Sequence, residues 1–352
     1  MRPALSRQPL KEFLDRLVRD GVVTSAVGLV GTADEILRED SAGQAREGVP
    51  THSSTRFDFA SITKPFMATL ALVLDAEGML PLATAIGEVW PQAHPKLARK
   101  KLSDLLRHRS GLAPWRPLYH LCRSREEVLD LLLGGELLGT RADTYSDLDF
   151  ILWGMTAVKA TGQSLPSLIR SRVLDPLGLS SVEPTPGDQP DVAESRMNTT
   201  KETQLAARAG IAIETLPPPP VGFPQDGNCR FLTGLEGGIG RLTGNAGLFG
   251  RARDLWILGA EWLEPRKLLQ PEGVAAALRG GRSFALGWWR RTLKGGGGRA
   301  LSPSSFGHTG FAGGNLWIDP ERRRVLVLLG HRIDPLADIH RWRRKFHSLN
   351  VR

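Results

Sequence analysis

Strand-like segments lie at both ends of this 352-residue chain, and a long stretch with helical patterns separates them. The apolar or β-branched runs that indicate strands are Ser25–Val30, Glu35–Glu39, Phe284–Arg291, Gly313–Ile318 and Arg324–Leu329. If both ends complete one sheet, the middle of the chain is an insertion. We therefore expect an α/β domain made of residues 1–79 plus 225–352, interrupted by a helical domain of residues 80–224.

Helical periodicity, broken by proline and glycine, fills most of the remaining chain. The segments expected to be helical are Phe66–Leu74, Leu102–Arg107, Glu126–Leu133, Leu148–Thr161, Leu165–Leu174 and Asp254–Leu263. Amphipathic helices are expected at both ends. The first carries Leu10, Phe13, Leu14 and Leu17, and the last carries Ile339, Trp342 and Phe346.

The charge pattern argues against a nucleic-acid partner. The net charge is +9, but the basic residues are scattered, and the dense cluster is Arg341, Arg343, Arg344 and Lys345. No zinc-finger, basic-zipper or RNA-motif signature accompanies that cluster. An apolar fraction of 41% supports a folded hydrophobic core instead. A binder of nucleic acid or anionic surfaces is kept as an alternative, and it predicts strongly salt-dependent binding.

The sequence gives no sign of export or membrane insertion. Charged residues interrupt the first helical segment, so it has no apolar signal-peptide core. No segment approaches the ~20 apolar residues of a membrane span. The two cysteines, Cys122 and Cys229, provide neither a disulfide framework nor metal spacing, and the histidines are not paired for a metal. We expect a cytoplasmic protein with no metal and no cofactor.

The sequence Ser61-Ile62-Thr63-Lys64 places a hydroxyl and an amine one helical turn apart, before the apolar stretch Phe66–Leu74. Serine is a weak nucleophile until a neighbouring base takes its proton, and a lysine at this spacing can serve. Helix N-terminal N–H groups can also stabilise an oxyanion. By itself the spacing is equally typical of an ordinary helix start with a solvated lysine.

Two further groups of residues strengthen this interpretation. Tyr145-Ser146-Asp147 contains one of only two tyrosines, and a tyrosine beside a lysine can relay a proton. His308-Thr309-Gly310-Phe311 precedes an expected strand, and its glycine leaves room for a ligand close to the backbone. Read alone, the first is also typical of a core tyrosine and the second of a glycine-rich hairpin.

Taken in order, Ser61-x-x-Lys64, Tyr145-Ser146-Asp147 and His308-Thr309-Gly310 resemble the active-site set of penicillin-binding proteins and class C β-lactamases. Five longer segments also resemble this family: Phe57–Lys64, Leu105–Leu112, Asn245–Phe249, Phe306–Pro320 and Leu328–Pro335. The resemblance covers nearly the whole chain. It implies an α+β, β-lactamase/DD-peptidase-like fold, with an antiparallel sheet flanked by helices and an inserted all-helical domain.

The resemblance also implies roles. Ser61 would be the acylated nucleophile, and Lys64 and Tyr145 would share the proton transfers. The backbone N–H groups of Ser61 and Phe311 would form the oxyanion hole. The residues expected to contact substrate are Asp147, His308, Thr309, Gly310, Phe311 and Trp115. The implied activity is a serine hydrolase that cleaves a small ester, amide or D-amino-acid peptide, more esterase- or peptidase-like than an efficient β-lactamase.

Three departures from the family pattern shape these expectations. Asp147 replaces a frequent asparagine, and its charge would keep Lys64 protonated, so we expect proton abstraction to depend more on Tyr145. Asn245 stands where histidine is common. The C-terminal helix is expected to lack the arginine that class C β-lactamases present to a substrate carboxylate. The alternative is a catalytically weak or inactive family member that acts as a binding or regulatory module.

Overall fold

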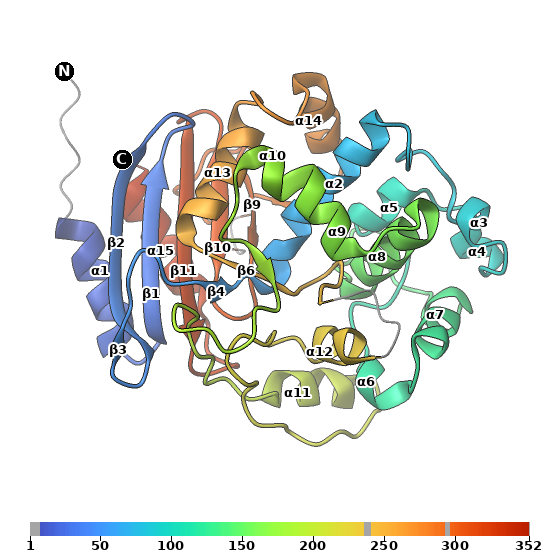
Figure 1. The fold of residues 1–352 in the computed structure, drawn as a ribbon, viewed down its shortest axis with the longest axis horizontal. Helices are drawn as coiled ribbons and strands as arrows, with labels where there is room; N and C mark the ends of the chain where they lie inside the picture. Colours follow the sequence, from blue (N-terminus) through green and yellow to red (C-terminus); the bar gives the residue numbers. More distant parts are fainter. Residues whose placement is uncertain (1–7, 236–240, 293–295, 352) are drawn as a thin grey trace.

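A computed structural model describes residues 8–235, 241–292 and 296–351. Within them, eight strands form an antiparallel sheet in the order β3-β2-β1-β11-β10-β9-β8-β7 (Figure 1). The strands are β1 (Val23–Gly31), β2 (Ile36–Arg46), β3 (Val49–Pro50), β7 (Phe284–Ala285), β8 (Trp288–Arg290), β9 (Phe306–Thr309), β10 (Asn315–Asp319) and β11 (Arg324–Arg332). Because β1 pairs with β11, the two ends of the chain meet inside one sheet. The predicted α+β class and antiparallel sheet are confirmed.

The predicted strand Phe284–Arg291 is wrong as a single element. It is a hairpin in which Phe284 pairs with Trp289 and Ala285 pairs with Trp288. Gly287 turns the chain with a φ of +72°, and a Cβ there would lie 2.4 Å from the Cβ of Ala68. The turn thus needs glycine both for its left-handed backbone and for its close approach to α2 (Thr63–Ala76).

Helices cover both faces of the sheet. In Figure 1, α1 (Gln8–Arg19) and α15 (His340–Asn350) lie on one face, and α13 (Ala252–Leu263) lies on the other. Strand side chains alternate between the two faces. On β11, Leu326 and Leu328 belong to the apolar cluster under α1 and α15, whereas the alternate residues Val325, Val327 and Leu329 belong to the main core.

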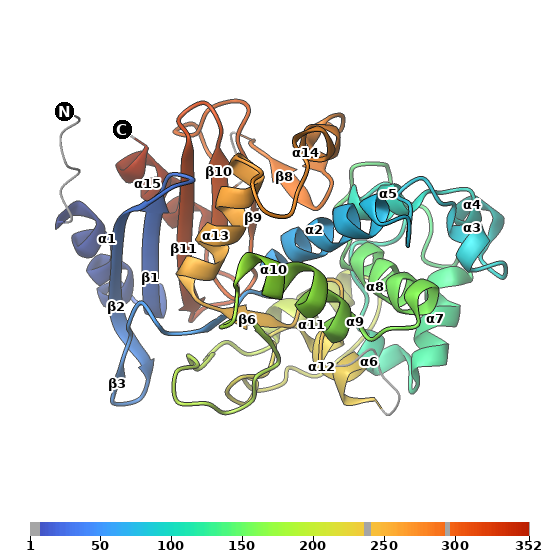
Figure 2. The same cartoon turned by 45° about the horizontal axis from the view of Figure 1, so that its top comes forward.

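The remaining helices gather beside the sheet, and α2 runs from the sheet into this helical region (Figure 2). They are α3 (Ile86–Val89), α4 (Pro95–Ala98), α5 (Leu102–Leu106), α6 (Leu118–Leu121), α7 (Arg125–Leu133), α8 (Asp147–Thr161), α9 (Leu165–Ile169), α10 (Asp175–Leu177), α11 (Thr200–Arg208), α12 (Gly227–Gly234) and α14 (Pro271–Leu278), with the π-helical turn Arg170–Leu174 between α9 and α10. Since α12 packs against α6, residues after 224 also join this region, and the domain boundaries stay predictions. Every described helix is too short or too polar to span a bilayer.

A second, small sheet connects the two regions. Its strands are β4 (Phe57–Asp58), β5 (Glu183–Pro184) and β6 (Leu248–Gly250), with β6 in the centre. Strands of two or three residues leave no periodic signal, so the sequence did not predict them. The sheet fixes the chain just before Ser61, and the N–H of Phe59 donates to the carbonyl of Leu248 at 2.9 Å.

Candidate active site

Ser61 lies on a short 3₁₀ turn, Ala60–Ile62, between β4 and α2. Ala60 has a φ of +46°, a conformation that residues other than glycine rarely adopt. The carboxylate of Asp58 holds this turn, because one oxygen accepts from the N–H of Ala60 at 2.7 Å and the other from that of Gln225 at 2.8 Å. Burial raises the pKa of Asp58 to about 6.

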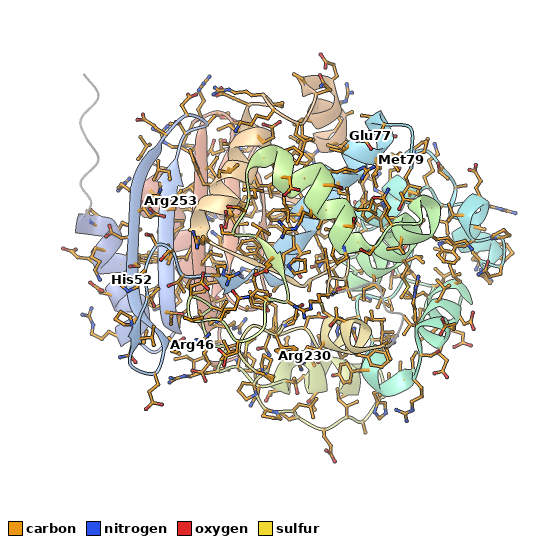
Figure 3. The ribbon with its side chains drawn as sticks, viewed as in Figure 1. Arg46, His52, Glu77, Met79, Arg230 and Arg253 are labelled. Atoms are coloured by element: carbon orange, nitrogen blue, oxygen red, sulfur yellow. The ribbon has the colours of Figure 1, made fainter. Side chains whose placement is uncertain are left out.

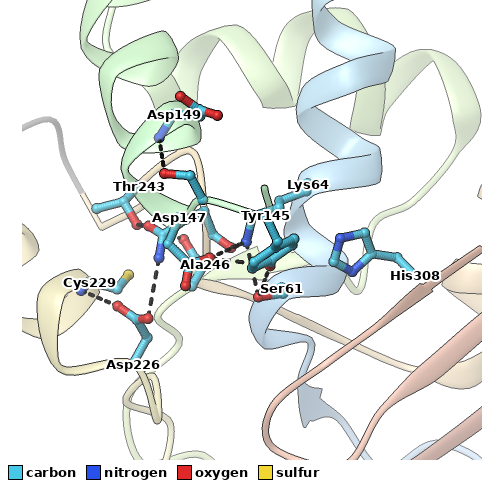
Figure 4. Close-up of polar contacts among 12 residues, drawn as sticks. Ser61, Lys64, Tyr145, Asp147, Asp149, Asp226, Cys229, Thr243, Ala246 and His308 are labelled. Atoms are coloured by element: carbon cyan, nitrogen blue, oxygen red, sulfur yellow. Dashed lines mark hydrogen bonds and ion pairs between the residues drawn. The ribbon is translucent and has the colours of Figure 1, made fainter. Parts of the chain in front are cut away.

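Lys64 lies at the start of α2, fully buried, with its ammonium beside Ser61 (Figure 4). Its Nζ donates to Ser61 Oγ at 3.0 Å, to Asp147 Oδ1 at 2.6 Å and to the carbonyl of Asn245 at 3.1 Å. A lysine ammonium has three N–H donors, so these acceptors use all of them. The arrangement fits a charged Lys64 paired with Asp147.

Tyr145 completes the group of side chains around Ser61. Its hydroxyl lies 3.0 Å from Ser61 Oγ and 3.2 Å from Asp147 Oδ1. Burial, followed by the negative charge of Asp147, raises the pKa of Tyr145 well above its ordinary value. The phenol therefore keeps its proton at neutral pH and bridges the serine to the carboxylate.

The turn that carries Tyr145 and Asp147 is held at the start of α8. Ser146 is the N-cap, accepting from the N–H of Asp149 at 3.3 Å and donating to the carbonyl of Ala113 at 2.7 Å. The N–H of Ser146 donates to Nδ1 of His108 at 3.1 Å. The segment Leu105–Leu112 thus supports the Tyr145 turn from behind.

A cavity of about 410 Å³ opens beside Ser61. Of the residues predicted from the sequence, those lining it are Ser61, Tyr145, Asp147, Trp115, Thr309, Gly310 and Phe311. A Cβ on Gly310 would lie 2.6 Å from the carbonyl oxygen of Phe59, so this glycine lets the end of β9 approach the segment carrying Ser61. The structure therefore brings the three separated sequence motifs to one place.

His308 lies behind the cavity wall, and Trp289 lines the cavity in front of it. Trp289 Nε1 donates to His308 Nε2 at 3.1 Å, and His308 Nδ1 lies 3.0 Å from the carbonyl oxygen of Thr309. Burial, and then the charge of Lys64, lowers the pKa of His308 well below its ordinary value. This histidine is a neutral imidazole that holds Trp289, and its predicted direct contact with substrate stays a prediction.

The expectation that the C-terminal helix offers no arginine to the cavity is wrong. Arg343 on α15 lines the cavity, and its Nη2 donates to the carbonyls of Gly310 at 2.7 Å and Gly314 at 2.9 Å. In the sequence, Arg343 was one of several arginines in a basic cluster. Its neighbours Trp342 and Phe346 pack toward the sheet, but only the tertiary structure shows which arginine faces inward.

Sequence reasoning also missed two carboxylates that line the cavity, Glu202 on α11 and Asp226 just before α12. No motif marked them, and neither helix had been predicted. Their one sequence signal is Asp226 followed by Gly227, a pattern typical of a turn or helix cap.

A model of the protein family described as Beta-lactamase matches residues 10–348. The chain belongs to this β-lactamase family. This member of the β-lactamase family is an enzyme of the serine hydrolase class. The match covers both the sheet and the helical region, in agreement with the fold described above.

Named relatives and solved structures resemble this β-lactamase-family protein at low identity. A putative D-alanyl-D-alanine carboxypeptidase of Escherichia coli (strain K12) is 26% identical, over 85% of this chain and 74% of its own length. Esterase EstB of Burkholderia gladioli is 27% identical, over 77% of this chain and 73% of its own. The structure of EstCE1, a hydrolase with promiscuous acyltransferase activity, has a TM-score of 0.75 at 18% identity and covers 97% of this chain and 98% of its own.

Proposed function

We propose that this protein hydrolyses a small ester, amide or D-amino-acid peptide through an acyl-enzyme on Ser61, with esterase- or peptidase-like activity exceeding β-lactam hydrolysis. The observation that carries the proposal is the contact of Ser61 Oγ with both Lys64 Nζ and Tyr145 OH, each at 3.0 Å, at the edge of a cavity. The names of the esterase and carboxypeptidase relatives support the same range of substrates.

The hydrogen bonds suggest how the proton leaves Ser61. Lys64 has no lone pair free while its three N–H groups donate, and Tyr145 is a neutral phenol. Neither group can simply accept a proton. We infer a relay in which Ser61 passes its proton to Tyr145 while Tyr145 passes its own to Asp147 Oδ1.

In the acylation step, Ser61 Oγ forms a bond to the carbonyl carbon as its proton enters the relay. The N–H groups of Ser61 and Phe311 stabilise the oxyanion, and the charge of Lys64 lies beside it. When the tetrahedral intermediate collapses, the bond to the leaving group breaks, and that group takes a proton back through Tyr145. Water then repeats the sequence and releases the acid. Trp115, Thr309, Gly310 and Phe311 shape the substrate cavity.

The alternative is a binding or regulatory module with little turnover, and one observation favours it. Lys64 forms an ion pair with Asp147 at 2.6 Å, and its three donated hydrogen bonds leave no lone pair to accept the proton of Ser61. Turnover then depends on the relay through Tyr145. Without a working relay, the cavity would bind a ligand but not hydrolyse it.

A substrate panel separates the two functions. Esters, D-amino-acid amides and cephalosporins are assayed with wild type, Ser61→Ala and the exposed-serine control Ser348→Ala. We expect turnover of esters or D-amino-acid amides to exceed that of cephalosporins, and Ser61→Ala to abolish it while Ser348→Ala leaves it unchanged. Binding without turnover would favour the module, and activity that survives Ser61→Ala would overturn the proposal.

The cytoplasmic location predicted from the sequence is also part of this proposal. Its support is that both cysteines, Cys122 and Cys229, are unpaired and buried, which suits a reducing compartment.

A further inference from the structure

Asp58 is a buried carboxylate that lies directly before the turn carrying Ser61. It is 2% exposed, and it is not among the residues that line the cavity. Its two oxygens accept from two separate chain segments, one from the N–H of Ala60 inside the turn and the other from the N–H of Gln225 just before α12. The carboxylate therefore joins the serine turn to a segment far along the chain.

The turn needs this support because its backbone is strained. Ala60 has a φ of +46°, in the left-handed region that an L-residue with a Cβ adopts only at a cost. Such a conformation persists only where the surrounding structure holds it in place. Asp58 accepts from the N–H of the strained residue itself, at 2.7 Å. The hydrogen bond thus acts at the point where the turn would otherwise relax.

The groups on either side of Asp58 are themselves fixed. The N–H of Asp58 donates at 3.3 Å to Nε2 of His331 on β11, whose other ring nitrogen lies 3.0 Å from a backbone carbonyl oxygen. On the other side, Arg230 on α12 (Figure 3) donates from Nη1 to the carbonyls of Pro224 at 2.9 Å and Gln225 at 3.2 Å. Asp58 is therefore held between the large sheet and the segment before α12.

The position of the turn decides whether Ser61 can react. Ser61 Oγ lies 3.0 Å from both Lys64 Nζ and Tyr145 OH, and the proposed function assigns the N–H of Ser61 to the oxyanion hole. A displacement of about 1 Å in a reacting group can lower a rate by about 10²-fold. A small relaxation at Ala60 would disturb the proton relay and the oxyanion hole together.

We propose that Asp58 is a positioning residue for the hydrolysis: its carboxylate fixes the strained turn that presents Ser61, and its protonation releases one of the two N–H groups and slows the reaction. Asp58 can have this role only if Ser61 is the nucleophile, so the role rests on the proposed function.

The charge state of Asp58 predicts the direction of the pH dependence. Burial raises the pKa of Asp58 to about 6; the charge of Asp226 also raises it, whereas its two N–H donors and the charge of Arg230 lower it. Above pH 6 both oxygens accept, and below pH 6 the added proton turns one acceptor into a donor that faces an N–H group. The reaction should therefore slow as the pH falls through about 6. Burial lowers the pKa of His331 to about 4, so this neighbour stays neutral throughout.

The test compares wild type with Asp58→Asn, because asparagine has the shape of the protonated acid and the same pattern of one acceptor and one donor. The rate of Ser61 labelling by a fluorophosphonate, and kcat and KM for a neutral ester, are measured from pH 5 to 8. Asp188→Asn, at an exposed position, is the matched control.

At pH 8 the labelling rate and kcat should be about 10- to 100-fold lower in Asp58→Asn, the size of effect expected for an unsatisfied buried N–H and a displaced nucleophile. KM should change little, because Asp58 does not line the cavity. The ratio of wild type to Asp58→Asn should narrow below pH 6, where wild type takes on the hydrogen-bonding pattern of the variant. Asp188→Asn should match wild type at every pH.

Two measurements separate positioning from a purely structural role. Circular dichroism and the final labelled fraction report how many molecules are folded. A role in stability alone would lower the labelled fraction but leave the labelling rate of each folded molecule unchanged. If Asp58→Asn does not fold, wild type alone still gives a test, because its labelling rate should fall between pH 7 and pH 5 while its circular dichroism stays native. An equal rate at both pH values would overturn the role of Asp58.

The remaining outcomes separate this role from the proposed function. A wild-type labelling rate in folded Asp58→Asn, or a ratio that stays constant from pH 5 to 8, would overturn the positioning role while labelling of wild type upholds Ser61 as the nucleophile. Absence of both labelling and ester hydrolysis in wild type would instead overturn the proposed function.

Discussion

The proton of Ser61 has a continuous hydrogen-bonded path through Tyr145 to Asp147, with Lys64 as a neighbouring fixed charge. Each contact in this path is between 2.6 and 3.2 Å. The path gives one expectation for the tyrosine and another for the aspartate.

Tyr145→Phe removes the bridge and leaves the ring in place. We expect kcat/KM to fall about 10²- to 10⁴-fold, nearly as far as in Ser61→Ala, because general acid–base catalysis by one group is of this size. Steady-state kinetics on one ester and one amide would measure it. Full activity in Tyr145→Phe would rule out the relay.

Asp147→Asn removes the carboxylate that receives the proton and that balances the charge of Lys64. The family resemblance by itself predicts that this change is tolerated and even improves turnover of amides or β-lactams, because the family's pattern usually has an amide at this position. The relay refines that expectation: kcat/KM should fall in the variant, because a neutral amide cannot accept the proton that Tyr145 passes on. A pH profile of kcat/KM from 6 to 10 tests this, and an unchanged profile would show that Asp147 only caps a turn.

For single residues, the sequence predicted the contacts that depend on spacing along one helix. Ser61 and Lys64 are one helical turn apart, so their contact could be predicted before any tertiary structure was known. Glu202, Asp226 and Arg343 are far apart in the chain and carry no motif. Their meeting depends on how α11, α12 and α15 pack, which spacing does not encode.

Among the elements, the hairpin of β7 and β8 together with β9 builds one wall of the cavity. It presents Trp289, which is held from behind by His308. Apolar character showed that this stretch was extended, but not that Gly287 folded it back on itself. The short strands around β6 were missed for a different reason: two or three residues leave no periodic signal, and their pairing joins chain segments far apart in sequence.

His308→Ala should lower kcat/KM by about 10- to 1000-fold, because Trp289 loses the acceptor for its indole N–H and can shift in the wall. His308→Gln offers an amide acceptor and should recover part of the activity. Burial and the charge of Lys64 keep the pKa of His308 well below its ordinary value. His308 therefore does not change its charge above pH 6, and the pH dependence of kcat/KM above pH 6 should be the same in wild type and in His308→Gln. Undiminished activity in His308→Ala would remove this histidine from the site.

For the whole molecule, the sheet is closed by strands from both ends of the chain, and α1 and α15 cover it together. The rings of Phe13 and Phe346 lie 5.9 Å apart between these helices. The strand-like segments at both ends of the sequence, separated by a helical middle, predicted that one sheet joins the two ends. They did not fix where the helical region stops, because α12 lies after the expected boundary and still packs against α6.

Phe346→Ala should lower the free energy of unfolding by about 3–5 kcal/mol, the usual cost of a cavity left by a fully buried phenylalanine. Leu349→Ala, on the exposed side of the same helix, should change it by less than about 0.5 kcal/mol. Urea unfolding of both variants measures the difference. Equal, small effects would show that α15 is not needed to hold the sheet together.

The most direct test of the account is covalent trapping of Ser61. The protein is incubated with an acylating or phosphonylating probe and analysed by intact-protein and peptide mass spectrometry, beside Ser61→Ala and the control Ser348→Ala. We expect one mass increment in wild type and in Ser348→Ala, on the peptide that contains Ser61, and none in Ser61→Ala. Labelling that persists unchanged in Ser61→Ala, or that falls on another peptide, would contradict the assignment of Ser61 as the nucleophile.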